Sequence, residues 1–445
     1  MKSENEVAQI AIIGGGPAGL FAAKQLTENG FNVAIFNRDI KPGGLAEYGI
    51  YPEKTKLKNG LRCQFRQIIG TAGIFYYGNT SIGEDLPLGI SDLKRLGFSA
   101  VLIAAGAQGT KDLELEGEDC SGVYHAKEIV YHYNHLPPYA LRSYPIGKKV
   151  VVLGIGNVMT DIVRYLLTLP HVEEITTVAR RGLAEVKFDK RELEPIVGQL
   201  DIADFTEEVA RISPAMREIG QEPLEQAAKI EEVYTALPEK SNHPKWRLRF
   251  LYSPVEILHA TGGVITDVRF EENYLEITST GTLAKGTRRY KNILADTLIM
   301  AIGDQVDDRL GIPMHGNHYP LEKIPRFPMG GVSYELVGSV IPGSEMEGVF
   351  VCGWSRNASS GMVGIARKDG VNAAGVIQAY LAETTPLEPV RLADLEKELH
   401  GSGYKFVRQA DLLKLEDAEV QKAQAENLSE YRFDSNEEML KAMGM

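Results

Sequence analysis

A glycine-rich turn between a β-branched run and a helical pattern occurs twice in this chain and constrains its fold more than any other feature. Residues 9–26 read QIAIIGGGPAGLFAAKQL, and the apolar run FNVAIFN follows after Gly30. Strand, glycine turn, helix and strand in this order form a βαβ unit, the context that a G-x-G-x-x-G turn requires. Residues 147–182 repeat the order as GKKVVVLGIGNVMTDIVRYLLTLPHVEEITTVARRG. We therefore predict two dinucleotide-type units.

Further apolar segments indicate how each unit is completed. FSAVLIAAGAQ (98–108) and ADTLIMAIGDQ (295–305) are typical of buried strands that run into a glycine turn, and EGVFVCGW (347–354) contains another strand. Residues 248–278 alternate apolar and polar side chains around turns, which predicts an antiparallel meander. The expected fold class is α/β, with two Rossmann-like three-layer dinucleotide-binding domains and the meander in the second.

The composition disfavours several classes of function. The 445 residues carry a net charge of −12, which argues against nucleic acid as a partner, because its phosphates need a basic face. No apolar run approaches the length of a membrane span, and the N-terminal residues show neither a secretory signal nor a transit pattern. We therefore expect a cytoplasmic protein.

The cysteines and histidines offer no metal or disulfide chemistry. Cys63, Cys120 and Cys352 lie far apart and form no C-x-x-C pair, so the chain provides neither a four-cysteine iron–sulfur cluster nor a vicinal redox disulfide. Reduction of thioredoxin or disulfides is excluded for the same reason. His132 and His135 share one helical face, but no acidic or sulfur ligand stands near them in the sequence, and we assign no metal.

The first glycine turn can hold a pyrophosphate. Gly14 permits the tight turn, Gly16 lets the backbone approach the phosphates, and Gly19 allows the helix and the strand to pack closely. The phosphates would lie at the helix N-terminus, where free N–H groups and the helix dipole favour negative charge. The next strand ends at Asn37, where an acid usually binds the ribose hydroxyls. The alternative is a glycine-rich turn without a ligand.

The second glycine turn reads GIGNVM at 154–159, and Met159 in its third position should hold the helix farther from the strand. After the second strand of this unit stand Arg180 and Arg181, where NAD-binding proteins have an acid. Two guanidinium groups suit the 2′-phosphate of NADP(H), which an acid would repel. The alternative is a solvated arginine pair. Two nucleotide folds in one chain then suggest a flavin in one and a nicotinamide dinucleotide in the other.

Motifs along nearly the whole chain resemble the adrenodoxin reductase family and its bacterial relatives, the ferredoxin–NADP+ reductases of the glutathione-reductase-like flavoprotein superfamily. There is also a weaker similarity to the small subunit of glutamate synthase, whose cysteine-rich N-terminal domain this chain lacks. The motifs are GGGPAG (14–19), GGLAEYGIYPEKTKLKN (43–59), GNVMTDIVRYL (156–166), ARRGLAEVKFDKRELE (179–194), and GW (353–354) followed by Gly361. The tryptophan is a specific mark, because related flavoproteins usually have GD at this strand end.

The resemblance implies FAD in the first site and NADP(H) in the second. Residues 1–107 would form the first part of the FAD-binding domain, 108–302 the NADP-binding domain, and 303–445 the second part of the FAD-binding domain with a C-terminal helical segment. The residues implied to bind FAD are Gly14, Gly16, Pro17, Ala18, Gly19, Asn37, Gly44, Leu45, Tyr48, Gly49, Gly106, Gly353, Gly361, Met362 and Val363. Those implied to bind NADP(H) are Gly154, Gly156, Asn157, Val158, Arg180, Arg181 and Glu192, with Trp354 beside the nicotinamide.

The chain departs from the family near the flavin. The family has a histidine there, thought to pair with the aspartate that corresponds to Asp161, whereas this chain has Lys54 at the histidine position. A lysine gives a fixed positive charge in place of a group that titrates near neutral pH, although it can equally be a solvated surface lysine. The catalytic candidates that follow from the resemblance are Lys54, Asp161 and Trp354.

Three functions remain open on the sequence. The first is an FAD-dependent oxidoreductase that transfers electrons between NADPH and a one-electron iron–sulfur carrier such as ferredoxin. An acidic carrier could dock on the basic run EKTKLKNGLRCQFRQ (53–67), which could equally be a solvated helical face. The second is an electron-input subunit of a larger complex, whose partner subunit bears the iron–sulfur clusters. The third is a redox sensor that binds flavin and NADP without turnover.

Overall fold

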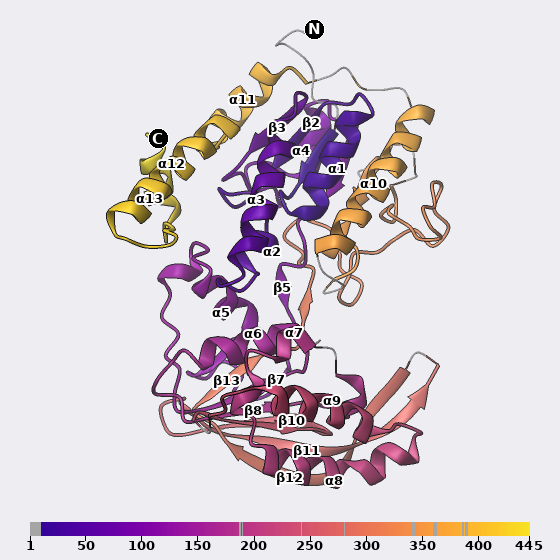
Figure 1. Ribbon diagram of the computed structural model, residues 1–445. Coiled ribbons are helices and arrows are strands. Elements are labelled where there is room, and N and C mark those ends of the chain that lie inside the picture. Colours follow the sequence, from indigo (N-terminus) through magenta and orange to yellow (C-terminus); the bar gives the residue numbers. More distant parts are fainter. Residues whose placement is uncertain are drawn as a thin grey trace. The chain divides into compact units, whose positions relative to one another are not determined.

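The computed structural model describes residues 10–186, 188, 190–241, 243–279, 281–339, 341, 343–344, 346–358, 363–384, 387 and 390–445. The chain folds into two compact units (Figure 1). Unit 1 consists of Met1–Lys111, Tyr131–Leu141 and Gly303–Met445, and unit 2 of Asp112–Val130 and Arg142–Ile302.

This division differs from the predicted domain bounds in two segments, because residues 108–111 and residues 131–141 group with unit 1. Residues 131–141 group with unit 1, although they lie within the range predicted for the second domain. The physical reason is a small apolar cluster in which Tyr131 and Leu136 pack against Tyr48 of unit 1. The pattern of strands and glycine turns in the sequence does not indicate that residues 131–141 pack on unit 1. The assignment of FAD and NADP(H) to the two domains stays a prediction.

Unit 1 is built around a parallel five-stranded sheet with the order β15-β4-β1-β2-β3. The strands are β1 (Ile10–Ile13), β2 (Val33–Phe36), β3 (Ile74–Tyr77), β4 (Ala100–Ile103) and β15 (Val349–Val351). They are short and almost wholly buried, as expected of parallel strands that are covered on both faces.

Alternate residues of β1 enter two different cores of unit 1. Ile10 and Ile12 pack in one core with residues of α1 (Pro17–Glu28), α3 (Thr55–Ile69), α10 (Val363–Glu383), α12 (Gln409–Ala425) and α13 (Asn436–Ala442). Ala11 and Ile13 pack in the other core with residues of α4 (Ile90–Arg95) and α11 (Leu392–Gly401). The unit therefore has three layers, which confirms the predicted α/β class. Its shorter elements are α2 (Leu45–Tyr48) and the antiparallel pair β5 (Gly109–Thr110) and β14 (Asp304–Gln305).

Unit 2 contains a second parallel five-stranded sheet with the order β6-β13-β7-β8-β9. Its strands are β6 (Val123–His125), β7 (Lys149–Leu153), β8 (Glu174–Val178), β9 (Lys245–Arg249) and β13 (Thr297–Met300), and its helices include α6 (Asn157–Leu166), α7 (Lys190–Leu193), α8 (Ile202–Glu218) and α9 (Pro223–Ala236). Helix α5 (Ala126–Tyr133) follows β6. The predicted second βαβ unit is thus β7, α6 and β8.

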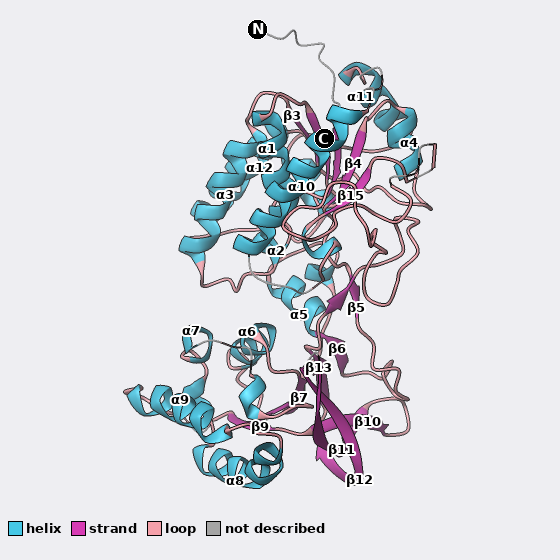
Figure 2. Ribbon diagram, turned by 90° about the vertical axis from the view of Figure 1, so that its right-hand side faces the viewer, coloured by secondary structure: helices cyan, strands magenta, loops and turns pink. Residues whose placement is uncertain are grey.

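The predicted meander is present and longer than expected. Figure 2 shows its three long antiparallel strands, β10 (Tyr252–His259), β11 (Ile265–Thr278) and β12 (Gly281–Leu294). Residues 248 and 249 belong instead to β9 of the parallel sheet, where Leu248 is fully buried. The last strand, β12, was not predicted because it is an edge strand whose residues are mostly exposed, so its sequence lacks the alternation of a half-buried strand.

None of the helices in the described part of the chain is long and apolar enough to cross a lipid bilayer.

Candidate functional site

The first glycine turn joins β1 to α1 and tolerates no side chain at two of its positions. Gly14 has a φ of +113°, and a Cβ there would collide with the carbonyl oxygen of Ala104 at the end of β4. A Cβ at Gly19 would collide with the carbonyl oxygen of Gly14. At Gly16, in contrast, a Cβ would have no other atom within 4 Å, so the space above the turn is open.

The N-terminus of α1 faces this turn without a side-chain cap. Gly16 is the N-cap residue, Pro17 opens the helix, and the first turn carries no acidic residue. The N–H groups and the positive end of the helix dipole are therefore available to an anion. Ala18 is buried, and a Cβ at Gly370 of α10 would collide with its carbonyl oxygen. The residues present fit a pyrophosphate.

Asn37 lies beside the turn, but its amide is bonded within the protein. Its Oδ1 accepts a hydrogen bond of 2.8 Å from the N–H of Gly15. Its Nδ2 lies 2.8 and 3.0 Å from the carbonyl oxygens of Asp39 and Lys41, and 3.0 Å from the Tyr76 hydroxyl oxygen. The side chain thus joins the glycine turn to the loop after β2. Binding of a ribose hydroxyl by Asn37 stays a prediction.

The loop at 43–49 packs on the same turn. The N–H of Gly43 donates to the carbonyl oxygen of Gly15 at 2.7 Å, and a Cβ at Gly44 would lie 3.3 Å from the Cα of Gly16. Leu45 opens α2, and Gly49 ends it. Tyr48 is buried among Tyr131 and Leu136. The structure therefore brings Gly44 to the first turn, while Leu45 and Tyr48 belong to the apolar cluster with Tyr131 and Leu136.

A second turn of unit 1, at residues 353–355, carries Trp354. Hydrogen bonds of the residues on either side of Trp354 hold this turn in place. Ser355 is fully buried, and its Oγ accepts from the N–H of Gly106 at 2.8 Å. The N–H of Gly353 donates to Asp369 Oδ2 at 2.6 Å. Trp354, between these two anchors, is half-buried. The turn and the loop after β4 are therefore joined through side chains.

Asp369 of α10 organises this second turn. Besides Gly353 it accepts from the Tyr334 hydroxyl at 2.8 Å and forms an ion pair with Arg356 at 2.5 Å. Burial raises the pKa of Tyr334 to about 12, so this hydroxyl remains a donor at neutral pH. The roles of Ser355 and Asp369 were not predicted from the sequence. No local signal distinguishes Asp369, because it directly follows the charged residues Arg367 and Lys368. The predicted residues Gly361 and Met362 lie outside the described residues, and Val363 is the first residue of α10.

The glycine turn of unit 2 repeats the geometry of the first. Gly154 has a φ of +117°, and a Cβ there would collide with the carbonyl oxygen of Ala301. Gly156 caps α6 without a side-chain hydrogen bond, and a Cβ on it would have no other atom within 4 Å. Asn157 and Val158 follow as exposed residues, Val158 with 46 % of its surface accessible. Met159, which replaces the third glycine, is fully buried.

The two arginines after β8 differ in their partners. Arg180 is exposed, and within the described part of the chain no acid or hydrogen-bond acceptor contacts its guanidinium. Arg181 donates to Glu185 at 3.1 Å, and its buried Nε has no hydrogen-bond partner there. Glu192 is half-buried on α7. A phosphate can therefore be bound by Arg180 without displacing a carboxylate, which fits the predicted 2′-phosphate.

Comparisons with known proteins agree with this geometry. Residues 8–191 match the family described as pyridine nucleotide-disulphide oxidoreductase. The mitochondrial NADPH:adrenodoxin oxidoreductase of Bos taurus is 26 % identical and covers 99 % of this chain and 93 % of its own length. The NADPH-ferredoxin reductase FprA of Mycobacterium leprae is 27 % identical over 86 % of each chain. The structure of Mycobacterium tuberculosis FprA in complex with NADPH has the same fold, with a TM-score of 0.83, 22 % identity, and coverage of 99 % of this chain and 100 % of its own.

The chain is thus similar along nearly its whole length to adrenodoxin and ferredoxin reductases. The departures from the family at Asn37 and Lys54 are properties of this chain. Lys54 is half-buried and precedes α3 in unit 1, and Asp161 is half-buried on α6 of unit 2. A catalytic role of Lys54, Asp161 and Trp354 stays a prediction.

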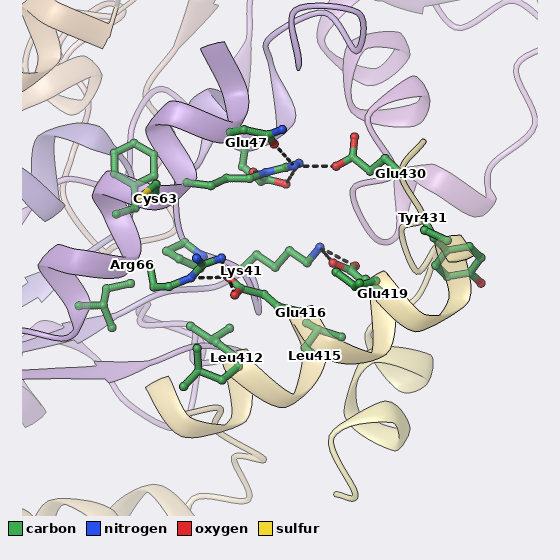
Figure 3. A pocket seen from close by; sticks show the side chains of 18 of the residues that line it. Lys41, Glu47, Cys63, Arg66, Leu412, Leu415, Glu416, Glu419, Glu430 and Tyr431 are labelled. Atoms are coloured by element: carbon green, nitrogen blue, oxygen red, sulfur yellow. Dashed lines mark hydrogen bonds and ion pairs between the residues drawn. The ribbon is translucent and has the colours of Figure 1, made fainter. Parts of the chain in front are cut away.

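The basic run at 53–67 is not the continuous docking surface that its sequence suggested. Lys58 is only 2 % exposed and donates to Asn134 Oδ1 at 2.8 Å. Arg62 binds both oxygens of Glu47 at 2.7 and 2.8 Å and also pairs with Glu430 at 2.7 Å. Arg66 pairs with Glu416 on α12 at 2.6 Å (Figure 3). Lys58 is thus bonded to an amide, and Arg62 and Arg66 are paired with acids, all within unit 1, which leaves less of the run for an acidic partner.

The histidines that we considered as metal ligands have protein partners. His132 Nδ1 lies 3.1 Å from the carbonyl oxygen of Tyr139, and His135 Nδ1 lies 2.6 Å from Asp434. In unit 2, ligand atoms of Asp112, Glu118 and His125 lie within 4.8 Å of one another. Glu118 there accepts the N–H of Leu113 at 2.8 Å and so already serves the backbone of its loop. We assign no metal to this group.

Proposed function

We propose that this chain is an FAD-dependent oxidoreductase that transfers electrons between NADPH and a one-electron iron–sulfur carrier such as ferredoxin. The proposal is supported by two helix N-termini, each of which follows a glycine turn and has no side-chain cap. The second is followed by Arg180, whose guanidinium has no partner among the described residues. The first site suits a pyrophosphate without further charge, and the second suits a dinucleotide with an additional phosphate. The similarity to adrenodoxin and ferredoxin reductases supports FAD and NADP(H) as the two dinucleotides.

Bound FAD supplies the chemistry that joins hydride exchange with NADP(H) to single-electron exchange with the carrier. The residues of the chain bind the two dinucleotides and orient them. The N–H groups of Gly16, Ala18 and Gly19 hold the FAD pyrophosphate. Those of Asn157 and Val158 hold the pyrophosphate of NADP(H). Arg180 binds the 2′-phosphate with charge-assisted hydrogen bonds. Asp369 and Ser355 fix the turn that carries Trp354, the residue that we place beside the nicotinamide.

The direct test of this function is anaerobic reduction of an iron–sulfur carrier. The FAD-loaded protein is mixed with NADPH and a [2Fe–2S] or a [4Fe–4S] ferredoxin, and the loss of the ferredoxin absorbance is followed. We expect NADPH-dependent reduction of at least one of them, and none with FAD-free protein. Reduction of bound FAD without transfer to either carrier would favour an electron-input subunit. If NADPH reduces neither FAD nor carrier, the sensor hypothesis takes its place.

We further propose a cytoplasmic location. All three cysteines are free, and the Cys63 thiol is exposed. Free thiols at a surface are typical of reducing compartments. Several relatives are mitochondrial proteins, so fractionation of cells that express the tagged chain is the deciding measurement.

A further inference from the structure

A pocket of about 560 Å³ lies in unit 1 between α3 and α12 (Figure 3). Residues 41, 42 and 47 also line it, as do residues 428–431, which follow α12. It shares no lining residue with the two glycine turns or with the turn at 353–355. Its volume lies in the range of about 300–1,000 Å³ that is typical of small-molecule sites.

The two facing helices give the pocket apolar walls. Phe65 and Ile69 of α3 and Leu415 of α12 are buried and line it. Leu413 and Val420, which also line it, are 44 % and 55 % exposed. Helix α12 thus contributes both buried and exposed apolar side chains to the pocket lining. An apolar occupant would remove part of this exposed surface from water.

Every charged side chain that lines the pocket is already paired with another one. Lys41 Nζ lies 2.5 and 2.6 Å from the two carboxylate oxygens of Glu419. Arg62 is shared by Glu47 and Glu430, and Arg66 pairs with Glu416. Figure 3 shows these pairs across the space between the helices. A charged occupant would have to compete with one of these pairs, and leaving a partly buried charge without a partner is costly.

The polar groups that remain in the lining are neutral. Gln409 and Gln424 lie at the two ends of α12, and Ser429 follows it. Within the described residues, no hydrogen-bond partner contacts these three side chains. The exposed Cys63 thiol also lines the pocket. The lining thus offers amide, hydroxyl and thiol groups to a ligand, but no unpaired ion.

We propose that this pocket binds an uncharged, mainly apolar small molecule that carries a neutral hydrogen-bonding group. The pocket is a site additional to the two dinucleotide sites, and the proposal does not depend on the proposed function. Apolar walls supply the affinity, and the unpartnered amides and hydroxyl orient the ligand.

Two dyes of nearly equal shape test this proposal on the full-length, FAD-loaded protein. N-phenyl-1-naphthylamine is uncharged, whereas 8-anilinonaphthalene-1-sulfonate has the same rings with a negative charge. The readout is the rate at which iodoacetamide alkylates Cys63, measured on its peptide by mass spectrometry. We expect saturating protection of Cys63 by the uncharged dye and at least tenfold weaker protection by the anionic one. Cys120, which lies in unit 2, should react at the same rate throughout.

Two variants locate the effect. Val420→Lys replaces an apolar side chain of the pocket lining with a charged one. Ile324→Lys makes the same change at another exposed position, where 89 % of the residue is accessible. The first variant should weaken protection by the uncharged dye at least tenfold, and the second should leave it unchanged. Dye binding without protection of Cys63, equal protection by both dyes, or no effect of Val420→Lys would each overturn the proposal.

Discussion

Asn37 stands where dinucleotide-binding proteins usually have a ribose-binding acid, but its side chain bonds the glycine turn to the loop after β2. Its amide donates to the carbonyl oxygens of the loop after β2, which a carboxylate cannot do. We expect Asn37→Asp to lower the stability of the FAD-free protein by about 1–3 kcal/mol, because carbonyl oxygens lose their donor. FAD should also dissociate faster. Thermal unfolding and FAD release are the measurements, with exposed Asn29→Asp as the control. Tighter FAD binding by Asn37→Asp would show that this side chain faces the ribose instead.

Arg180 should determine the preference for NADPH. Its guanidinium is exposed and binds no acid within the described residues, so its removal costs the chain no internal contact. We expect Arg180→Ala to raise the KM for NADPH at least tenfold and to leave the KM for NADH unchanged, because only NADPH carries the 2′-phosphate. Arg288→Ala, an exposed arginine on β12, is the matched control. An equal effect on both nucleotides would contradict a phosphate contact.

At the scale of elements, the close packing of α1 and α10 supports the first glycine turn. A Cβ at Gly370 would collide with the carbonyl oxygen of Ala18, whereas one at Gly364 on the same helix would have no other atom within 4 Å. We expect Gly370→Ala to separate the helices, lower the melting temperature by several degrees and release FAD. Gly364→Ala should be neutral or stabilising by up to about 1 kcal/mol. Similar behaviour of the two variants would show that this helix contact is not limiting.

Helix α3 contains a buried lysine whose contribution to stability should depend on pH. Lys58 donates to Asn134 and to the carbonyl oxygen of Ile50, and burial lowers its pKa from 10.5 to about 8. Between these values the unfolded chain binds more protons than the folded one, so stability rises with pH, by at most about 1.4 kcal/mol per unit.

The matched variants for this prediction are Lys58→Met and Lys56→Met, the second at an exposed position of α3. Melting temperatures are compared at pH 7.5 and pH 9.5. The stability of the natural chain relative to Lys58→Met should increase over this range, while its stability relative to Lys56→Met should not. A constant difference for Lys58→Met would mean that the lysine keeps its ordinary pKa in the folded chain.

At the scale of the whole molecule, features that depend on local pattern could be predicted from the sequence, and those that depend on distant partners could not. The β1-α1-β2 and β7-α6-β8 units follow from apolar runs and glycines within about 35 residues. Arg62 and Arg66 pair with Glu430 and Glu416, more than 300 residues farther along the chain, so the sequence of the basic run does not reveal that these two charges are paired within unit 1. Likewise, Ser355 and Gly106 are 249 residues apart in the sequence, and they meet because β15 and β4 are neighbours in the sheet.

The central claim is that unit 1 binds FAD and unit 2 binds NADP(H). Its most direct test is anaerobic rapid mixing of the FAD-loaded protein with NADPH and, separately, with NADH, following the visible absorption band of oxidised flavin. The account predicts fast loss of this band with NADPH and at least tenfold slower loss with NADH, and a smaller difference in Arg180→Ala. Equal rates with both nucleotides would contradict the assignment of NADP(H) to unit 2, and no loss with either would contradict the claim as a whole.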